Sequence, residues 1–83
     1  MKRNKTFTKA LGSQLYNARS ALGYSQAKTA ELTGISERWY QALESGKRSP
    51  SGEVLLKLVF VLRIDINVFY DAVSLEPELF ALL

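Results

Sequence analysis

Residues 25–46, SQAKTAELTGISERWYQALESG, decide how this chain folds. Two serines of the stretch, Ser25 and Ser36, are each followed by a run that suits a short helix and then by a glycine. A serine accepts a hydrogen bond from the free N–H groups at a helix start, and a glycine adopts the left-handed conformation that ends many helices. The pattern predicts helices from Gln26 to Thr33 and from Glu37 to Ser45, with Ser25 and Ser36 as their N-caps.

The second of these helices has one apolar and one polar face. At about 100° per residue, Trp39, Tyr40 and Leu43 fall within one arc. We expect this arc to fasten the helix to the core, with Tyr40 buried and Trp39 half exposed at the arc's edge. The opposite face carries the polar or small residues Glu37, Arg38, Gln41, Ala42, Glu44 and Ser45.

A helix is also predicted before this stretch. Leu11, Leu15, Ala18 and Leu22 recur with the spacing of one helical face, and Gly23 can end the helix with a left-handed cap.

Two more helices are predicted after it. Ser51 can cap a fourth helix whose body, VLLKLVFVLR at 54–63, is apolar on most sides, so we expect it to be the central and most buried helix. Asp65 can cap a fifth, INVFYDAV at 66–73, which is followed by the tail SLEPELFALL. The sequence therefore predicts one all-α domain, residues 1–83, of five helices.

Composition bears on function as well as on fold. The sequence has no Cys and no His, so no zinc site built from these residues and no imidazole-activated nucleophile can form. We expect no enzymatic activity, no metal and no cofactor. The basic start is not followed by an apolar signal segment, and no apolar run reaches the roughly 18 residues of a membrane span, so we expect a cytoplasmic protein without a membrane partner.

Charge is distributed unevenly along the chain. Residues 1–48 contain nine basic and three acidic side chains, a net charge of +6, whereas residues 49–83 contain two basic and five acidic ones, a net charge of −3. A basic first half indicates either an anionic partner such as nucleic acid or an ordinary solvated surface. Within it, Lys2, Arg3 and Lys5 can be an arm that reaches DNA or a disordered terminus.

Two short helices joined by a glycine turn form a helix-turn-helix, whose second helix fits the major groove of B-DNA. The spacing of Gln26, Ala30, Gly34, Tyr40 and Leu43 resembles the motif of the phage repressor/Cro family, also called the XRE family. The flanking segments resemble that family's first and fourth helices, so that the resemblance covers residues 11 to 71. The chain departs from the family at residues 28 and 29, where Lys and Thr replace the usual acid and leucine.

The resemblance implies a repressor-like fold, with the helix-turn-helix at residues 26–45, and a sequence-specific partner, double-stranded DNA. It also implies an ion pair between Arg19 and Glu44 that holds the recognition helix, although Arg19 could instead contact a phosphate. We expect phosphate contacts from Gln26, Ser45, Lys47 and Arg48; for the last two, a solvated basic turn is the other interpretation. The resemblance places base-contacting side chains at Ser36, Glu37, Arg38, Gln41 and Ala42.

Arg38 can bind guanine through two hydrogen bonds, and Ala42 can touch only a thymine methyl group. Glu37 can accept from cytosine, but an acid at the first position of a helix is favoured by the dipole in any case.

The apolar end of the chain predicts assembly. Residues 66–83 offer more apolar side chains than so small a core can absorb, which favours a homodimer that binds an inverted repeat as a small repressor. The alternatives are a tail that folds back over its own domain, and an antitoxin-like protein that holds a toxin partner while repressing its own promoter. The predicted dimer interface comprises Val68, Phe69, Val73, Leu75, Leu79, Phe80, Leu82 and Leu83.

Overall fold

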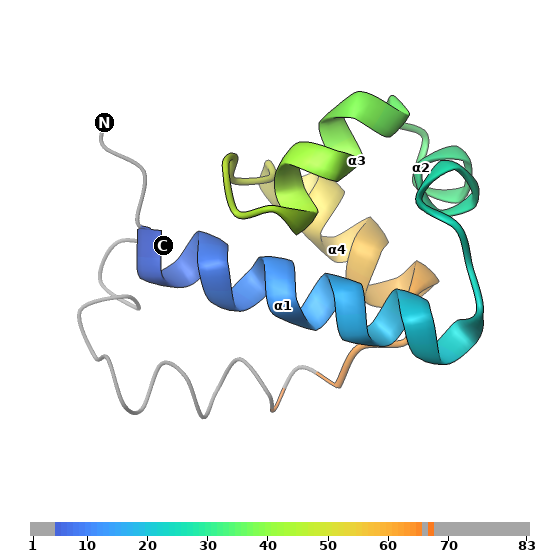
Figure 1. The fold of residues 1–83 in the computed structure, drawn as a ribbon, viewed down its shortest axis with the longest axis horizontal. Helices are drawn as coiled ribbons and strands as arrows, with labels where there is room; N and C mark the ends of the chain where they lie inside the picture. The colour runs from blue at the N-terminus through green and yellow to red at the C-terminus, as the bar shows by residue number, and fades with distance from the viewer. Residues whose placement is uncertain (1–4, 66, 68–83) are drawn as a thin grey trace.

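The computed structural model describes residues 5–65 and 67, and this part of the chain is all-α, as predicted. Figure 1 shows α1 along one side of the molecule, α3 above it, α2 near the C-terminal end of α1, and α4 behind them. Within the described ranges, no helix is long and apolar enough to cross a membrane. The four helices are α1 (Lys5–Leu22), α2 (Gln26–Thr33), α3 (Glu37–Glu44) and α4 (Gly52–Val61).

The last three helices begin at the serines that the sequence predicts. In each case the serine hydroxyl oxygen accepts a hydrogen bond from a backbone N–H in the first turn, which satisfies one of the donors left free at a helix start. These bonds measure 2.9 Å from Lys28 to Ser25, 3.0 Å from Trp39 to Ser36 and 3.3 Å from Val54 to Ser51.

The core is built from all four helices. Its fully buried side chains include Leu11 and Leu15 of α1, which lie on the predicted stripe, and Tyr40 and Leu43 of α3. Trp39 is half-buried and packs against this cluster, so the predicted division of α3 into a core-facing arc and an outer face is confirmed. The remaining members of the core are Ala30, Val54, Leu58 and Leu62.

Helix α2 packs into the core although Thr29 replaces the leucine that is usual in the resembled family. Thr29 is fully buried, and its hydroxyl donates to the carbonyl of Ser25 at 3.0 Å. One turn later, the hydroxyl of Thr33 donates to the carbonyl of Thr29 at 2.7 Å. Because these bonds remain within the helix, the hydroxyls are paired and the threonine methyl groups can fill the apolar contact.

The prediction that the fourth helix is the most buried one is wrong. Helix α4 buries Val54 and Leu58, but Leu56 is 68% exposed and Phe60 84% exposed. Among the described helices, α4 has neighbours on one side only, as expected for a helix at the side of a small bundle. The apolar residues on its second face therefore form an exposed strip.

The structure also changes the expected start of the chain. Lys5 is the first residue of α1, so the proposed arm or disordered terminus does not include it. At the other end, Asp65 accepts a hydrogen bond from the backbone N–H of Asn67 at 2.9 Å. The rest of the predicted fifth helix and the tail lie outside the described residues.

Candidate nucleic-acid interface

Helix α3 presents one polar face to solvent. Ser36, Glu37, Arg38 and Gln41 are exposed and Ala42 is half-buried, so the structure brings the five expected base-contacting residues together on one surface. On the opposite face, Tyr40 and Leu43 are fully buried. The helix ends at Glu44, one residue before the predicted end, with Ser45 as its C-cap. Gly46, whose φ is 77°, then turns the chain into the exposed loop that carries Lys47 and Arg48.

A bidentate ion pair holds α3 against α1. Arg19 donates from Nε to Oε2 of Glu44 at 2.8 Å and from Nη2 to Oε1 at 2.9 Å. The third nitrogen of the guanidinium, Nη1, donates to the carbonyl of Tyr24 at 2.9 Å, and the ring of Tyr16 lies 5.5 Å from the guanidinium carbon. The same guanidinium thus ties α1, the turn before α2 and α3 together, and such planar forked pairing favours a fixed geometry.

The electrostatics of this pair favour its charged form. Burial alone would raise the pKa of Glu44, but the hydrogen bonds from Arg19 and Gln26 outweigh it, and the pKa lies below its ordinary value of 4.5. Burial raises the pKa of the neighbouring Tyr40 phenol, so this group stays protonated. The hydroxyl of Tyr40 makes no hydrogen bond to the described residues, although the charged groups of Glu44 and Arg19 lie close enough to act on its pKa.

Gln26 links the ion pair to the polar face of α3. Its side-chain nitrogen donates to Oε1 of Glu44 at 3.1 Å, and its oxygen accepts from the side chain of Gln41 at 3.3 Å. Gln41 also donates to Glu37 at 3.3 Å. The expected phosphate contact from Gln26 would therefore come from an amide that already positions two α3 residues.

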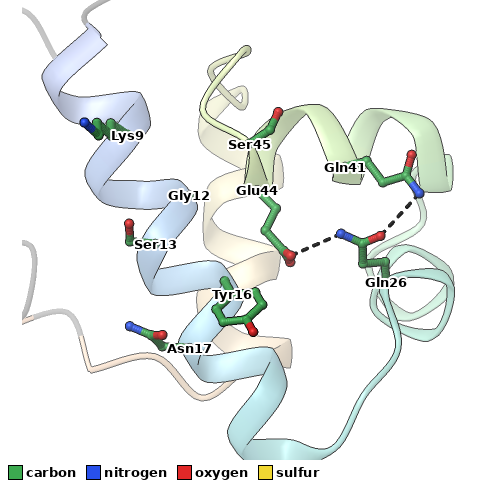
Figure 2. Close-up of a pocket in the computed structure, with 9 residues that line it drawn as sticks. All are labelled: Lys9, Gly12, Ser13, Tyr16, Asn17, Gln26, Gln41, Glu44 and Ser45. Atoms are coloured by element: carbon green, nitrogen blue, oxygen red, sulfur yellow. Dashed lines mark hydrogen bonds between the residues drawn. The ribbon is translucent and has the colours of Figure 1, made fainter.

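An open groove of about 480 Å³ runs between α1 and this chain of hydrogen bonds. Figure 2 shows Glu44 and Tyr16 directed into the space between α1 and α3, with Gln26 and Gln41 joined on its far side. Ser45, another expected phosphate contact, lines the groove, and its hydroxyl donates to the carbonyl of Ala42 at 3.1 Å. The groove is also lined by Lys9, Gly12, Ser13 and Asn17.

Gly12 allows α1 and α3 to approach so closely, and the sequence analysis missed it. A Cβ at this position would lie closer than 3.0 Å to the carbonyl oxygen of Glu44 and 3.1 Å from that of Leu43. The signal was present in the sequence, because glycine inside a helical pattern is disfavoured by about 1 kcal/mol relative to alanine and often marks a close backbone contact.

The expected dimer interface lies outside the described residues. Within them, the largest exposed apolar side chains are Phe60 and Leu56, one turn apart on α4, followed by Tyr16 and Leu32. The Lys57–Glu53 ion pair on the same helix is 3.4 Å long and exposed.

Comparison with known proteins identifies the fold and motif. The sequence pattern of the helix-turn-helix family HTH_3 matches residues 15–69. An uncharacterized HTH-type transcriptional regulator of Mycobacterium tuberculosis is 34% identical over 68 residues, which cover 81% of this chain and 49% of that protein. YonR, an SPbeta prophage-derived uncharacterized HTH-type transcriptional regulator of Bacillus subtilis, is 29% identical over 68 residues, which cover 82% of this chain and 63% of YonR. The chain thus spans about half the length of the first relative and less than two thirds of the second.

Solved structures show the same arrangement. The restriction-modification controller protein C.AhdI from Aeromonas hydrophila superposes with a TM-score of 0.68 at 31% identity, covering 75% of this chain and 94% of C.AhdI. The clp gene regulator ClgR from Corynebacterium glutamicum gives a TM-score of 0.72 at 25% identity, covering 89% of this chain and 80% of ClgR.

Proposed function

The chain belongs to the HTH_3 helix-turn-helix family, of the XRE type, and from this premise we propose that it binds double-stranded DNA sequence-specifically as a transcriptional regulator, most simply a small repressor. The observation that carries the proposal is the polar face of α3, which is exposed while its other face is anchored in the core. A helix held in this way can enter a major groove without rearranging the domain.

Base reading is assigned to the outer face of α3. The guanidinium of Arg38 suits the two acceptors of guanine, and the amide of Gln41 suits adenine. Glu37 can accept from cytosine, Ser36 can donate to or accept from a base, and Ala42 can contact a thymine methyl group. Its half-buried position allows only such a short-range apolar contact.

Backbone contacts are assigned to the ends of the motif. Lys47 and Arg48 are exposed in the loop after α3, where their charges can neutralise phosphates whatever the DNA sequence. Gln26 and Ser45 lie beside the groove between α1 and α3. Gln26 also holds α3 through Glu44, and Ser45 bonds to the carbonyl of Ala42 at the end of its own helix, so we assign each a phosphate contact beside this bond.

Selection of bound duplexes from a random pool, followed by footprinting, tests the proposal and defines the operator. Arg38→Ala should then weaken operator binding by about 1 to 3 kcal/mol and relax the preference at one base pair. Lys47→Ala should weaken binding to all duplexes equally and lower the salt slope by about one counterion. Equal losses on operator and random DNA for Arg38→Ala would remove its base-reading role, and absence of any enriched sequence would remove the function itself.

We also propose that the protein acts as a homodimer on an approximate inverted repeat. One recognition helix contacts few base pairs, and two related helices about 34 Å apart read two half-sites. The exposed Leu56 and Phe60 support an apolar protein contact in addition to the residues expected beyond the described part of the chain.

The same apolar strip supports the second candidate, an antitoxin-like module that holds a toxin. A second protein that copurifies at one-to-one stoichiometry and shields Phe60 would favour this candidate. A self-associating protein without such a partner would favour the homodimer.

A further inference from the structure

A second hollow flanks α3 on the side away from the groove. Its volume is about 330 Å³, and no residue is shared between the two sites. At about 100° per residue, Trp39 and Ala42 lie on one edge of the polar face, and Gln41 and Glu44 lie on the other. Helix α3 is therefore a ridge between two hollows, the second of which is lined by Ser36, Arg38, Trp39, Ala42 and Arg48.

This second hollow is rich in unpaired donors. Among the described residues, the ion pairs are those of Arg19 with Glu44 and of Lys57 with Glu53, so neither Arg38 nor Arg48 has an acidic partner there. The indole N–H of Trp39 likewise donates no hydrogen bond to the described residues. Two guanidinium groups and an indole donor with no acceptor complement an anion whose oxygens only accept, which is the chemistry of a phosphodiester.

The dimensions of DNA place such a group beside this hollow. The major groove is about 12 Å wide, and a helix with its side chains is about 10 to 12 Å across. A helix inserted there has a sugar-phosphate strand along each flank. The groove with Gln26 and Ser45 faces one strand, and the hollow with Trp39 and Arg48 faces the other.

We propose that Trp39 and Arg48 together hold one phosphate of this second strand, with the indole N–H and the guanidinium as donors. The inference rests on the proposed function, and it gives Trp39 a binding role in addition to its packing against the core. Arg38 remains the base reader, and its charge at the rim of the hollow attracts the same phosphate.

Fluorescence gives the first test, because Trp39 is the single tryptophan of the chain. The full chain is titrated with its selected operator, with a random duplex and with inorganic phosphate at constant ionic strength. We expect both duplexes to change the emission and to reduce quenching by acrylamide. If the emission of Trp39 stays unchanged when the protein is saturated with duplex, the inference is overturned while DNA binding stands, even where inorganic phosphate changes the emission.

Substitutions give the second test, with labelled DNA as the reporter. Trp39→Phe retains an aromatic ring but removes the N–H, so we expect melting to change little and affinity for every duplex to fall about 10-fold. Arg48→Gln should lower affinity similarly and reduce the salt slope by about one. Arg63→Gln is the matched control, because Arg63 is exposed at the end of α4 and outside the hollow, and it should bind like the wild type.

Chemical replacement of single phosphates decides whether the two residues share a ligand. Uncharged methylphosphonates are placed in turn along the operator. At one position the wild type should lose affinity, while Trp39→Phe and Arg48→Gln should be almost insensitive, and the double variant should lose less than the sum of the single losses.

Several outcomes contradict the inference. Wild-type affinity of Trp39→Phe, or additive losses in the double variant, would overturn it even though the operator is still bound. Absence of binding to any duplex would instead reject the proposed function and the inference with it. If Trp39→Phe lost its helical signal, the emission and acrylamide quenching of the wild type on DNA would decide for Trp39, and the methylphosphonate scan with Arg48→Gln would decide for Arg48, which is exposed.

Discussion

Four residues in the described part of the chain have a positive φ, and each follows the end of a helix. Three are glycines, Gly23, Gly34 and Gly46, with φ of 74°, 81° and 77°. The fourth is Arg63, which holds a φ of 54° after α4, where the backbone N–H of Ile64 closes the turn onto the carbonyl of Val59 at 3.0 Å. A side chain with a Cβ in this conformation is strained by about 1 to 2 kcal/mol.

Arg63→Gly should therefore stabilise the protein. We expect the relief of strain to exceed the entropy that glycine adds to the unfolded chain, with a net gain of about 0.5 to 1 kcal/mol in the free energy of unfolding by urea. Gly23→Ala is the converse control. A Cβ there meets no atom within 4 Å, so a change in its free energy of unfolding reports the backbone strain and not a steric clash. A loss of stability in Arg63→Gly would show that the arginine side chain makes a contribution larger than its strain.

The Arg19–Glu44 pair should make stability depend on pH. The pKa of Glu44 is lowered in the folded protein, so its contribution is present above its ordinary value of 4.5 and is lost as the pH falls through the lower, folded value. We expect the wild type to lose stability on acidification below about pH 4.5. Glu44→Gln should lose about 3 kcal/mol at neutral pH, near the lower end of the range for breaking a buried pair because the carboxylate borders an open groove.

Urea unfolding of both proteins from pH 7 to pH 3 measures this effect. The difference in unfolding free energy between wild type and Glu44→Gln should shrink as the solution becomes more acidic. A constant difference across this range would mean that the pair does not control the acid response.

Residues that act locally were predictable from the sequence itself, whereas the Arg19–Glu44 pair, which acts across the fold, was expected only from the family resemblance. Ser25, Ser36 and Ser51 bond to the backbone of their own first turn, so the neighbouring sequence suffices to identify them as caps. Arg63 gave no such signal, because arginine has no preference for a positive φ. The role of Gly12 depends on its contact with α3. In the sequence α2 lies between the two, so the residues around Gly12 do not reveal this contact.

At the scale of elements, the site depends on how closely α1 and α3 approach. The contact at Gly12 places the C-terminal end of α3 directly on the backbone of α1, and the Arg19–Glu44 pair fixes the direction of α3 about two turns further along α1. The orientation of the proposed base-reading face is thus set by α1, a helix that carries none of the expected base-contacting residues.

Gly12→Ala should displace α3. The added Cβ meets backbone oxygens that cannot rotate away, so we expect a loss of about 1 to 3 kcal/mol in stability, reduced by the better helix propensity of alanine. Operator affinity should fall more than affinity for random DNA, because base contacts are more sensitive to orientation than phosphate contacts. Gly52→Ala, at the first position of α4 with no atom within 4 Å of the new Cβ, is the matched control and should be neutral or stabilising in urea unfolding.

An unchanged midpoint for Gly12→Ala would mean that the helices can separate without loss. Equal weakening on operator and random duplexes would show that the orientation of α3 is not what the glycine protects.

The burial of α4 could not be predicted from its own sequence. A run that is apolar on most sides indicates a buried helix when the domain is large enough to surround it, but here its neighbours cover only the face with Val54 and Leu58. Composition gives the apolar surface that a helix offers, and topology decides how much of it the chain itself covers.

At the scale of the whole molecule, the exposed strip on α4 bears on assembly. Phe60 is 84% exposed and Leu56 68% exposed, and exposed apolar side chains that lie next to each other can mark an interaction surface. We therefore extend the proposed homodimer interface to these two residues.

Phe60→Gln should separate assembly from folding. Because the ring is exposed, we expect its removal to change the stability of the monomer by no more than about 0.5 kcal/mol, while the dimer dissociates at lower concentration and operator binding weakens. Lys57→Gln, an exposed change on the same helix, is the control. Sedimentation of the full chain, free and on operator DNA, measures the effect. Equal masses for wild type and Phe60→Gln at every concentration would exclude α4 from the interface.

The division of α3 into an anchored face and an outer face has a consequence for how such proteins diversify. Tyr40, Leu43 and Glu44 fix the position of the helix, whereas Glu37, Arg38 and Gln41 are exposed and do not belong to the core cluster. Substitutions at the outer positions can thus accumulate nearly neutrally with respect to folding. Duplicated genes can thus diverge in the DNA sequence that their proteins would bind while every intermediate protein still folds. In the same way, a designer can vary these positions on one unchanged scaffold to obtain regulators with different targets.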